Sequence, residues 1–228
     1  MTPNLKKFIE TYIHLIDSEN YAELYENFET SSLAESTRDL TNVLLSIDIS
    51  IEDILKKLQD IPALFAAGCN QFTEVIIPDN IESIGRNAFW RCEKLEKAFV
   101  SKKCEYISDG CFRECINLQS IDIGNITDIP TDAFKNCINL TTIHNSKSIE
   151  SISSNAFNGC TNLTVIELSQ NIRSIESKAF SKCGSNLVIK YKGSKDDWKL
   201  ICDPHAFDGT YYQIVCSDGI FKRSPSKS

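Results

Sequence analysis

The amino-acid sequence predicts an α/β solenoid in which parallel strands form one face and an α-helical segment caps the N-terminal end. Three observations support this fold class. The pattern I-x4-F-x2-C-x2–3-L occurs five times in the middle of the chain, and its phenylalanines are 23, 22, 23 and 23 residues apart. Apolar residues alternate after each copy, as in a strand with one buried side. The first 60 residues instead place apolar residues at steps of three and four, as in an amphipathic helix.

Residues 1–60 are expected to form an acidic helical cap. Their longest apolar stripe comprises Leu5, Phe8, Ile9, Tyr12, Ile13 and Ile16. This segment holds 12 acidic and 5 basic side chains, a net charge of −7, whereas residues 61–228 hold 19 of each. Because the end of a solenoid exposes apolar core, it needs a cap with a polar outer surface. The step from Ile61 to Pro62 is expected to end the last helix, since a residue before proline disfavours the helical conformation.

Residues 61–190 are expected to form repeats of 22–24 residues, a period typical of leucine-rich repeats. The repeat phenylalanines are Phe89, Phe112, Phe134, Phe157 and Phe180, and Phe65 belongs to a less regular first copy. A strand of the form L-x-x-I-x-I follows each copy and turns alternate side chains into the core. A second apolar pair, such as Ile81 and Ile84, covers the opposite wall, and the Ala-Phe segment makes a short helical turn.

Eight of the ten cysteines are expected to be reduced core residues in a reducing compartment rather than part of a disulfide framework. These eight occupy apolar positions of the repeat: Cys69, Cys92, Cys104, Cys111, Cys115, Cys137, Cys160 and Cys183. The sequence leaves open whether Cys202 and Cys216 pair or bind metal. Free cysteine behaves as a small apolar residue and is among the residue types most often buried. One repeat cysteine in each coil also gives no obvious scheme for pairing.

The repeat unit IPDNIESIGRNAFWRCEKLEKAFV resembles the BspA-type leucine-rich-repeat family, whose copies read I-P-x-x-V-x-x-I-G-x-x-A-F-x-x-C-x-x-L-x-x-V-x-I. The resemblance extends over about residues 61–219, and residues 1–60 fall outside it. Residues 191–219 are similar to the terminal coil of that family at Tyr191, Gly193, Trp198, Phe207, Cys216 and Gly219. We therefore expect a C-terminal capping coil over residues 191–221, followed by a disordered basic tail over residues 222–228.

The family resemblance implies adhesion or protein–protein contact, and it implies no shared catalytic residues. Motifs for phosphate binding, a serine nucleophile or a zinc protease are absent from the sequence. We therefore expect a chain that is not an enzyme and that uses no cofactor. Many bacterial members of the family are exported and bound to the cell surface, so a surface adhesin exported by a non-classical route is one alternative function.

Composition and charge limit the kinds of partner. No run of about 18 apolar residues is present, which argues against membrane insertion. Residues 1–10 contain no apolar region followed by a cleavage site, so we expect a cytoplasmic protein, in the host cytoplasm if the gene is viral. The charges of residues 61–228 balance, and nucleic-acid binding requires clustered positive charge. These observations favour a protein partner.

The outward positions of the predicted strands are the candidate partner-binding surface. One row, stacked from coil to coil, is Ile76, Phe99, Asp122, His144 and Glu167, and the neighbouring row is Glu74, Lys97, Ser120, Thr142 and Val165. Ile76 and Phe99 are the expected apolar anchors, while Lys97, Asp122, Thr142, His144 and Glu167 are expected to set specificity. In the alternative arrangement, the N-terminal helices fold over Ile76 and Phe99 and cover them.

Two groups of residues suggest a metal site. Asp122, His144 and Glu167 place two carboxylates around one imidazole, but they equally describe a histidine that pairs with acids on an open sheet. Cys202 and His205, with Cys216 and Cys183, supply only one of the two paired ligand motifs that structural zinc usually shows. We therefore expect no metal at either place.

The sequence as a whole favours a non-catalytic module that binds a protein partner through the outward strand face of the solenoid. In a second alternative, the chain is a structural or assembly protein that self-associates through its N-terminal helices. The sequence leaves the oligomeric state open.

Overall fold

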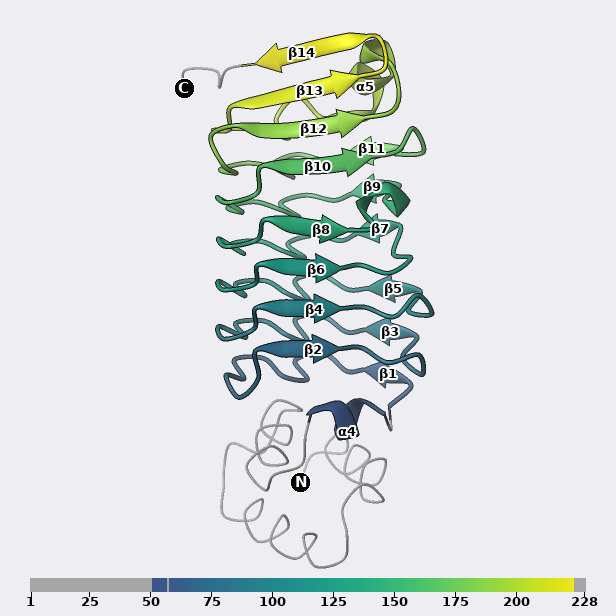
Figure 1. Ribbon diagram of the computed structural model, residues 1–228, viewed down its shortest axis with the longest axis vertical. Coiled ribbons are helices and arrows are strands. Elements are labelled where there is room, and N and C mark those ends of the chain that lie inside the picture. Colours follow the sequence, from purple (N-terminus) through teal and green to yellow (C-terminus); the bar gives the residue numbers. More distant parts are fainter. Residues whose placement is uncertain (1–50, 57, 224–228) are drawn as a thin grey trace, which may run out of the picture.

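The computed structural model describes residues 51–56 and 58–223, which form a solenoid of coils stacked along one axis (Figure 1). Successive coils contribute strands to two walls, and the strands of successive coils pair in parallel. The predicted solenoid is therefore confirmed. Helix α4 (Ile51–Leu55) lies at the N-terminal end of the stack and contacts β2. The helical stripes expected within residues 1–50 lie outside the described residues, as do residues 224–228.

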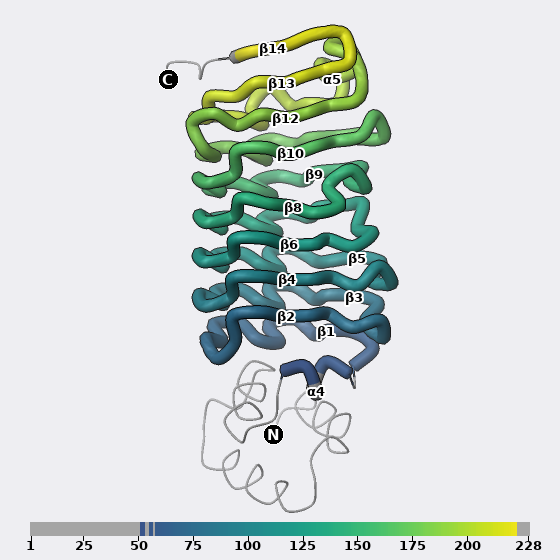
Figure 2. Tube along the Cα trace, in the orientation of Figure 1, coloured from purple at the N-terminus to yellow at the C-terminus, as the bar shows by residue number. Residues whose placement is uncertain are grey.

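The first wall consists of two four-stranded sheets. One sheet contains β2 (Glu74–Ile76), β4 (Lys97–Phe99), β6 (Ser120–Asp122) and β8 (Thr142–His144), in that order. The other contains β10 (Val165–Leu168), β12 (Leu187–Tyr191), β13 (Tyr212–Cys216) and β14 (Gly219–Arg223). The strands stack in chain order along the molecule (Figure 2). The boundary between the two sheets falls between β8 and β10.

The second wall consists of shorter strands in two parallel three-stranded sheets. These strands are β1 (Asp60–Ile61), β3 (Ser83–Ile84), β5 (Tyr106–Ile107), β7 (Asp128–Ile129), β9 (Ser151–Ile152) and β11 (Ser174–Ile175). The segment around each Ala-Phe pair, which is expected to make a short helical turn, forms turns with hydrogen bonds between residues three apart; the Cys115 amide, for example, donates to the Phe112 carbonyl.

The repeat phenylalanines form one continuous stack through the core. The rings of Phe89, Phe112, Phe134, Phe157, Phe180 and Phe207 lie 5.2–5.7 Å apart, with at most 13° between successive planes. This spacing lies within the range of favourable offset-stacked aromatic pairs. Each coil therefore buries its ring against the rings of both neighbours, which couples adjacent coils.

The repeat cysteine supplies a hydrogen bond as well as apolar volume. The thiol of Cys115 donates to the carbonyl of Phe89 at 3.0 Å, and that of Cys137 donates to the carbonyl of Phe112 at 3.1 Å. In the last coil, Thr210 takes this position and donates to Phe180 at 2.8 Å. The position therefore holds a small buried donor, whose hydrogen bond adds to the one that the same carbonyl accepts from the amide three residues further on.

All ten cysteines lie in the described part of the chain and are free. The eight that were expected in the core are buried there, as predicted. Burial raises the pKa of the Cys183 thiol to about 12 and that of Cys104 to about 11, because the thiolate loses hydration. These two thiols therefore stay protonated at neutral pH and remain hydrogen-bond donors.

The C-terminal end of the solenoid is closed by helix α5 (Lys195–Ile201) and a β-hairpin. A capping box between Ser194 and Asp197 begins α5, whose Trp198 is buried against Tyr191. Strand β14 pairs antiparallel with β13, and this pairing extends to Arg223. The first two residues of the tail expected over residues 222–228 are therefore ordered in a strand, because β13 offers them backbone partners.

Candidate binding face

The outward side chains of β2, β4, β6 and β8 form the two rows that the sequence predicts. One row pairs Ile76 with Phe99, Phe99 with Asp122 and Asp122 with His144, and the other pairs Glu74 with Lys97, Lys97 with Ser120 and Ser120 with Thr142. This part of the predicted register is confirmed. Beyond β8 the rows are interrupted, and Glu167 pairs with Lys190 while Val165 pairs with Val188. We call the outward side of β2, β4, β6, β8, β10 and β12 the strand face.

Ile76 and Phe99 form an apolar end of the strand face. Their exposed fractions are 55% and 39%, although both are large apolar side chains. They lie side by side because β2 and β4 pair in register at these positions. Lys97, also exposed, lies on the same strand as Phe99. The described N-terminal helix, α4, leaves both side chains exposed, and the other helices that the alternative arrangement places over Ile76 and Phe99 lie outside the described residues.

The sheet is interrupted after β8 because one residue departs from the repeat. In the other coils the last residue of the repeat motif L-x-x-I-x-I is apolar and buried. These residues are Ile77, Val100, Ile123, Leu168 and Tyr191. In this coil the position is taken by Asn145, which is exposed and adopts a left-handed conformation with φ of 63°. A polar amide is unfavourable in the core without partners, so the chain turns outward here into the 3₁₀ helix η2 (Ser146–Ser148).

A side-chain hydrogen bond replaces the lost backbone bond. In the three preceding coils, the amide of the inward residue donates to the next strand: Ile77 to Phe99, Val100 to Asp122 and Ile123 to His144. At the interruption, the hydroxyl of Ser146 donates to the Glu167 carbonyl at 2.8 Å. Ser146 is itself buried. The hydrogen bond from Ser146 therefore stabilises the outward turn of the chain after β8.

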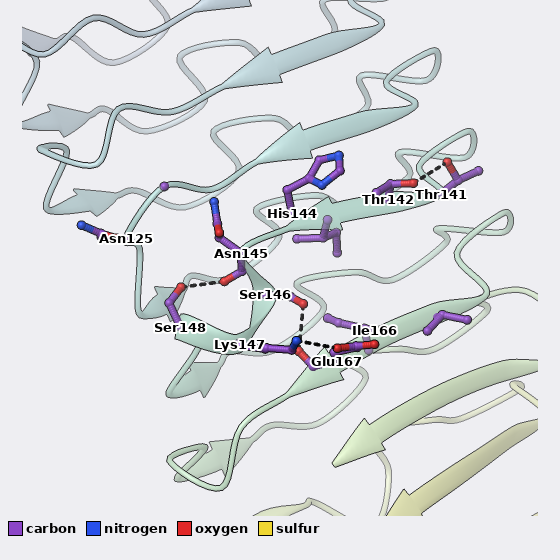
Figure 3. A pocket seen from close by; sticks show the side chains of 13 residues that line it. Asn125, Thr141, Thr142, His144, Asn145, Ser146, Lys147, Ser148, Ile166 and Glu167 are labelled. Atoms are coloured by element: carbon purple, nitrogen blue, oxygen red, sulfur yellow. Dashed lines mark hydrogen bonds and ion pairs between the residues drawn. The ribbon is translucent and has the colours of Figure 1, made fainter. Parts of the chain in front are cut away.

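The interruption opens a pocket of about 500 Å³ on the strand face, which we call the β8–β10 pocket. Thr142, His144, Asn145, Lys147 and Glu167 are among the residues that line it, and Figure 3 shows these side chains around the opening. Ile143 is 9% exposed in its floor, whereas the equivalent Ile121 is 1% exposed. The widened boundary between the sheets thus gives access to a part of the core.

Asp122 and Glu167, the two carboxylates of the predicted row, bind different partners. The Asp122 carboxylate accepts from the Gly124 amide at 2.9 Å and from the Asn145 side chain at 2.5 Å. The Glu167 carboxylate lies 2.9 Å from the Lys147 ammonium and 3.0 Å from that of Lys190. Neither carboxylate is paired with His144 in these contacts. Within residues 51–56 and 58–223 there is no group of three His, Cys, Asp or Glu side chains placed to hold a metal.

The second candidate metal site has its residues in different surroundings. Cys216 is buried on β13, Cys202 is half-buried at the end of α5, and the His205 side chain is exposed beside Asp208 at 3.4 Å. Cys183 donates its thiol to the Phe157 carbonyl in the core. The terminal coil therefore uses these residues in separate contacts.

Glu167 gives the strand face a pH-dependent ion pair. Hydrogen bonds and charge from Lys147 and Lys190 lower the pKa of Glu167 to about 2, below the value of about 4.3 of an unperturbed side chain. Its contribution to stability is therefore present above about pH 4.3 and is lost as the pH falls towards 2. We expect Glu167→Gln to lower the thermal midpoint at pH 7 by about 2 °C, because exposed ion pairs contribute little.

Thermal unfolding of wild type and Glu167→Gln at low salt, at several pH values, checks this prediction. The two midpoints should converge near pH 2 and also in high salt, which screens the pair. A difference that persists unchanged at pH 2 would contradict it.

The sequence interpretation missed three residues of the pocket. Asn145, Ser146 and Lys147 form its edge, and none was among the predicted site residues. The signal was present in the sequence, since Leu140-x-x-Ile143-x-Asn145 is the repeat L-x-x-I-x-I with its last apolar residue replaced.

The described residues include no helix long and apolar enough to cross a membrane.

Comparisons with known proteins agree with the repeat geometry. The profile of the BspA type leucine rich repeat region matches in six copies, over residues 41–147 and 127–197. No curated protein matches the sequence.

Several solved structures are similar to this chain. A leucine rich cell surface protein from Faecalibacterium prausnitzii is 31% identical with a TM-score of 0.55, over 57% of this chain and 35% of the other. A leucine-rich repeat protein from Bacteroides ovatus is 20% identical with a TM-score of 0.54, over 70% and 46%. The Leucine Rich Repeat protein of T. pallidum is 21% identical with a TM-score of 0.51, over 58% and 66%.

The chain thus spans less than two thirds of the length of each of these structures. At about 20% identity, the latter two show the fold alone. The fold is one that typically mediates protein interaction or adhesion and is typically non-enzymatic. The profile match extends from residue 41 to residue 197, more than half of the chain, with the same repeat that the Phe stack and cysteine bonds define. This protein belongs to the BspA-type leucine-rich-repeat family.

Proposed function

We propose that this protein is a non-catalytic binding module that holds a protein partner on its strand face. The observation that carries the proposal is the exposed apolar pair Ile76 and Phe99 on adjacent, register-paired strands. A sheet held by a continuous core stack changes shape little on binding, which limits the entropy that binding costs. Apolar anchors surrounded by polar side chains are typical of the centre of a protein interface.

The polar part of the strand face supports the same proposal. Lys97 is exposed on β4, which also carries Phe99, and Thr142 and His144 are exposed on β8, which is separated from β4 by β6 in the same sheet. Polar groups around an apolar anchor favour one partner over others, since an unmatched charge at an interface is unfavourable. An apolar end and a polar end on one surface therefore fit a partner with matching chemistry along its length.

Affinity capture from a lysate of the source organism tests this proposal, with the full chain as bait and mass spectrometry as the readout. We expect a partner retained by wild type to be lost with Phe99→Arg, because a charge replaces the apolar anchor. Tyr106→Arg is the matched control, since Tyr106 is an aromatic residue that is 56% exposed on β5 in the other wall. Equal capture by wild type and Phe99→Arg would reject the strand face as the binding surface.

Adhesion at a cell surface is the second candidate function. It is favoured by the similarity to the F. prausnitzii protein, which is described as a cell surface protein. Protease treatment of intact source cells distinguishes this candidate: a surface protein is degraded, while an internal one is protected until the cells are lysed.

A further inference from the structure

The apolar end of the strand face lies where the chain enters the solenoid. Helix α4 contacts β2, the strand that carries Ile76, at the N-terminal end of the stack (Figure 1). The side-chain amide of Asn80, in the turn after β2, donates to the carbonyls of Leu55 and Leu58 at 2.8 and 2.5 Å. These bonds fix α4 to the coil of β2, so the chain that precedes α4 is attached next to the apolar pair.

We propose that residues 1–50 occupy this end of the strand face, with their apolar stripe from Leu5 to Ile16 against Ile76 and Phe99, until a partner displaces them. The displacement rests on the proposed function, because it concerns the same surface. The intramolecular contact stands on its own and is tested separately below.

The sequence of residues 1–50 supplies apolar surface that requires burial. Its longest stripe, at steps of three and four residues, contains Leu5, Phe8, Ile9, Tyr12, Ile13 and Ile16. A stripe with this spacing is stabilised mainly by packing against another apolar surface, since an isolated helix in water is marginal. Leu55 and Leu58 are themselves buried at the end of the solenoid, so part of that end is already covered.

Ile76 and Phe99 form the apolar surface that this stripe can reach first. They are register neighbours at the N-terminal end, and exposed apolar side chains that lie together are typical of contact sites. In the part of the chain that the structure describes, the other exposed large apolar side chains are Tyr106, Ile138, Val165, Leu200, Tyr211 and Ile220. Tyr106 pairs with Ser83 on the other wall, and the remaining five belong to later coils.

The length of chain before α4 allows the contact. Residues 17–50 link the stripe to α4 and can span up to about 110 Å, whereas adjacent strands of a sheet are about 4.8 Å apart. Eleven steps of about 1.5 Å separate Leu5 from Ile16 in a helix, or about 17 Å, which is enough to cover Ile76 and Phe99 together. Because stripe and face belong to one chain, their contact is intramolecular and requires little intrinsic affinity.

This contact regulates access to the strand face. A partner reaches Ile76 and Phe99 only in those molecules from which the stripe has moved away. Its apparent affinity is reduced by the fraction of such molecules, so a face that is covered about nine-tenths of the time binds about tenfold more weakly. A partner with a larger apolar surface than the stripe can still displace it.

Photo-crosslinking in the full-length protein tests the intramolecular contact without a partner. Phe99 is replaced by p-benzoylphenylalanine, which keeps an aromatic group at this position and reacts with neighbouring C–H groups on irradiation. We expect cross-links from position 99 to peptides of residues 1–20, in protein of monomer mass. The same replacement of Tyr106, an exposed aromatic residue on β5 in the other wall, is the matched control and should give only background yield.

Substitutions in the stripe test its identity and its effect on binding. The double variant Phe8→Asp, Ile13→Asp places two charges in the stripe and should abolish the cross-link from position 99. The control Thr11→Asp, Ser18→Asp adds the same charge at polar positions off the stripe and should keep the cross-link. In affinity capture, the first double variant should bind the partner of the strand face about tenfold more tightly than wild type.

A cross-link at position 99 no stronger than at position 106 would overturn the inference, and so would a cross-link that survives Phe8→Asp, Ile13→Asp. In either case the proposed function stands if Phe99→Arg still loses the partner. Cross-linked dimers would assign the face to a second copy and also overturn the inference. An intramolecular cross-link, together with no captured partner that depends on Phe99, would uphold the contact and reject both the proposed function and the displacement.

Discussion

Replacing Phe134 with alanine is expected to lower the free energy of unfolding by about 3–5 kcal/mol. Phe134 is fully buried, and its ring stacks on Phe112 at 5.7 Å and on Phe157 at 5.3 Å. Truncation removes the apolar volume and both ring contacts at once, in a coil near the middle of the array. In a solenoid, stability is a sum of coils and of the contacts between neighbours, so the two halves should also become less coupled.

Urea unfolding followed by circular dichroism and by Trp fluorescence measures both effects. Wild type should unfold in one transition with both probes, whereas Phe134→Ala should show an earlier transition and a lower dependence on urea concentration. Phe99→Ala is the control, because the same truncation at an exposed ring should change stability by about 0.5 kcal/mol. Equal midpoints for wild type and Phe134→Ala would show that the repeat register is wrong.

Replacing Asn145 with leucine is expected to stabilise the protein by about 1–3 kcal/mol and to close the β8–β10 pocket. The coil already has the correct length, because Ile143 and Ile149 are six residues apart, as are Ile166 and Ile172 in the next coil. With leucine, residues 145–149 would read Leu-Ser-Lys-Ser-Ile, close to the regular Leu168–Ile172 segment of sequence LSQNI. The leucine can then enter the core, and its amide can donate to the Glu167 carbonyl in place of Ser146.

Hydrogen exchange of residues 140–150, together with urea unfolding, checks this expectation. Exchange in the segment should slow and the unfolding midpoint should rise. Asn125→Leu is the control, because Asn125 also lines the pocket but its side chain is exposed in a turn, so stability should not increase. A lower midpoint for Asn145→Leu would mean that the outward turn is required by the backbone and is not a consequence of the asparagine. A gain in stability with weaker capture of the partner would mark a trade-off between stability and binding.

The fold could be predicted from the sequence because every coil repeats the same pattern of apolar residues. The spacing of the phenylalanines fixes the coil length, and the alternation after each leucine fixes which strand side chains turn inward. The rows from Ile76 to His144 and from Glu74 to Thr142 follow directly, and the structure places them in the predicted register. Periodic sequences allow this because each coil contacts only its neighbours.

The candidate site was predictable only in part. Ile76 and Phe99 are exposed as their outward positions require, but the row does not continue unbroken from His144 to Glu167. The prediction of a stacked row requires the strand of every coil to pair with the strand of the next coil. At Asn145 the chain turns outward, so β8 and β10 do not pair. The lysine that binds Glu167 from η2, Lys147, lies outside the repeat positions and could not be placed by register.

The sequence by itself determined the family, the coil length, the buried cysteine and phenylalanine positions and the outward rows, because these depend on local periodicity. Only the tertiary structure decided where the sheet breaks, which carboxylate each lysine binds and that the cysteine thiols donate to carbonyls of the preceding coil. Those features depend on distances between coils, and such distances follow from packing around a single irregular residue rather than from the repeat.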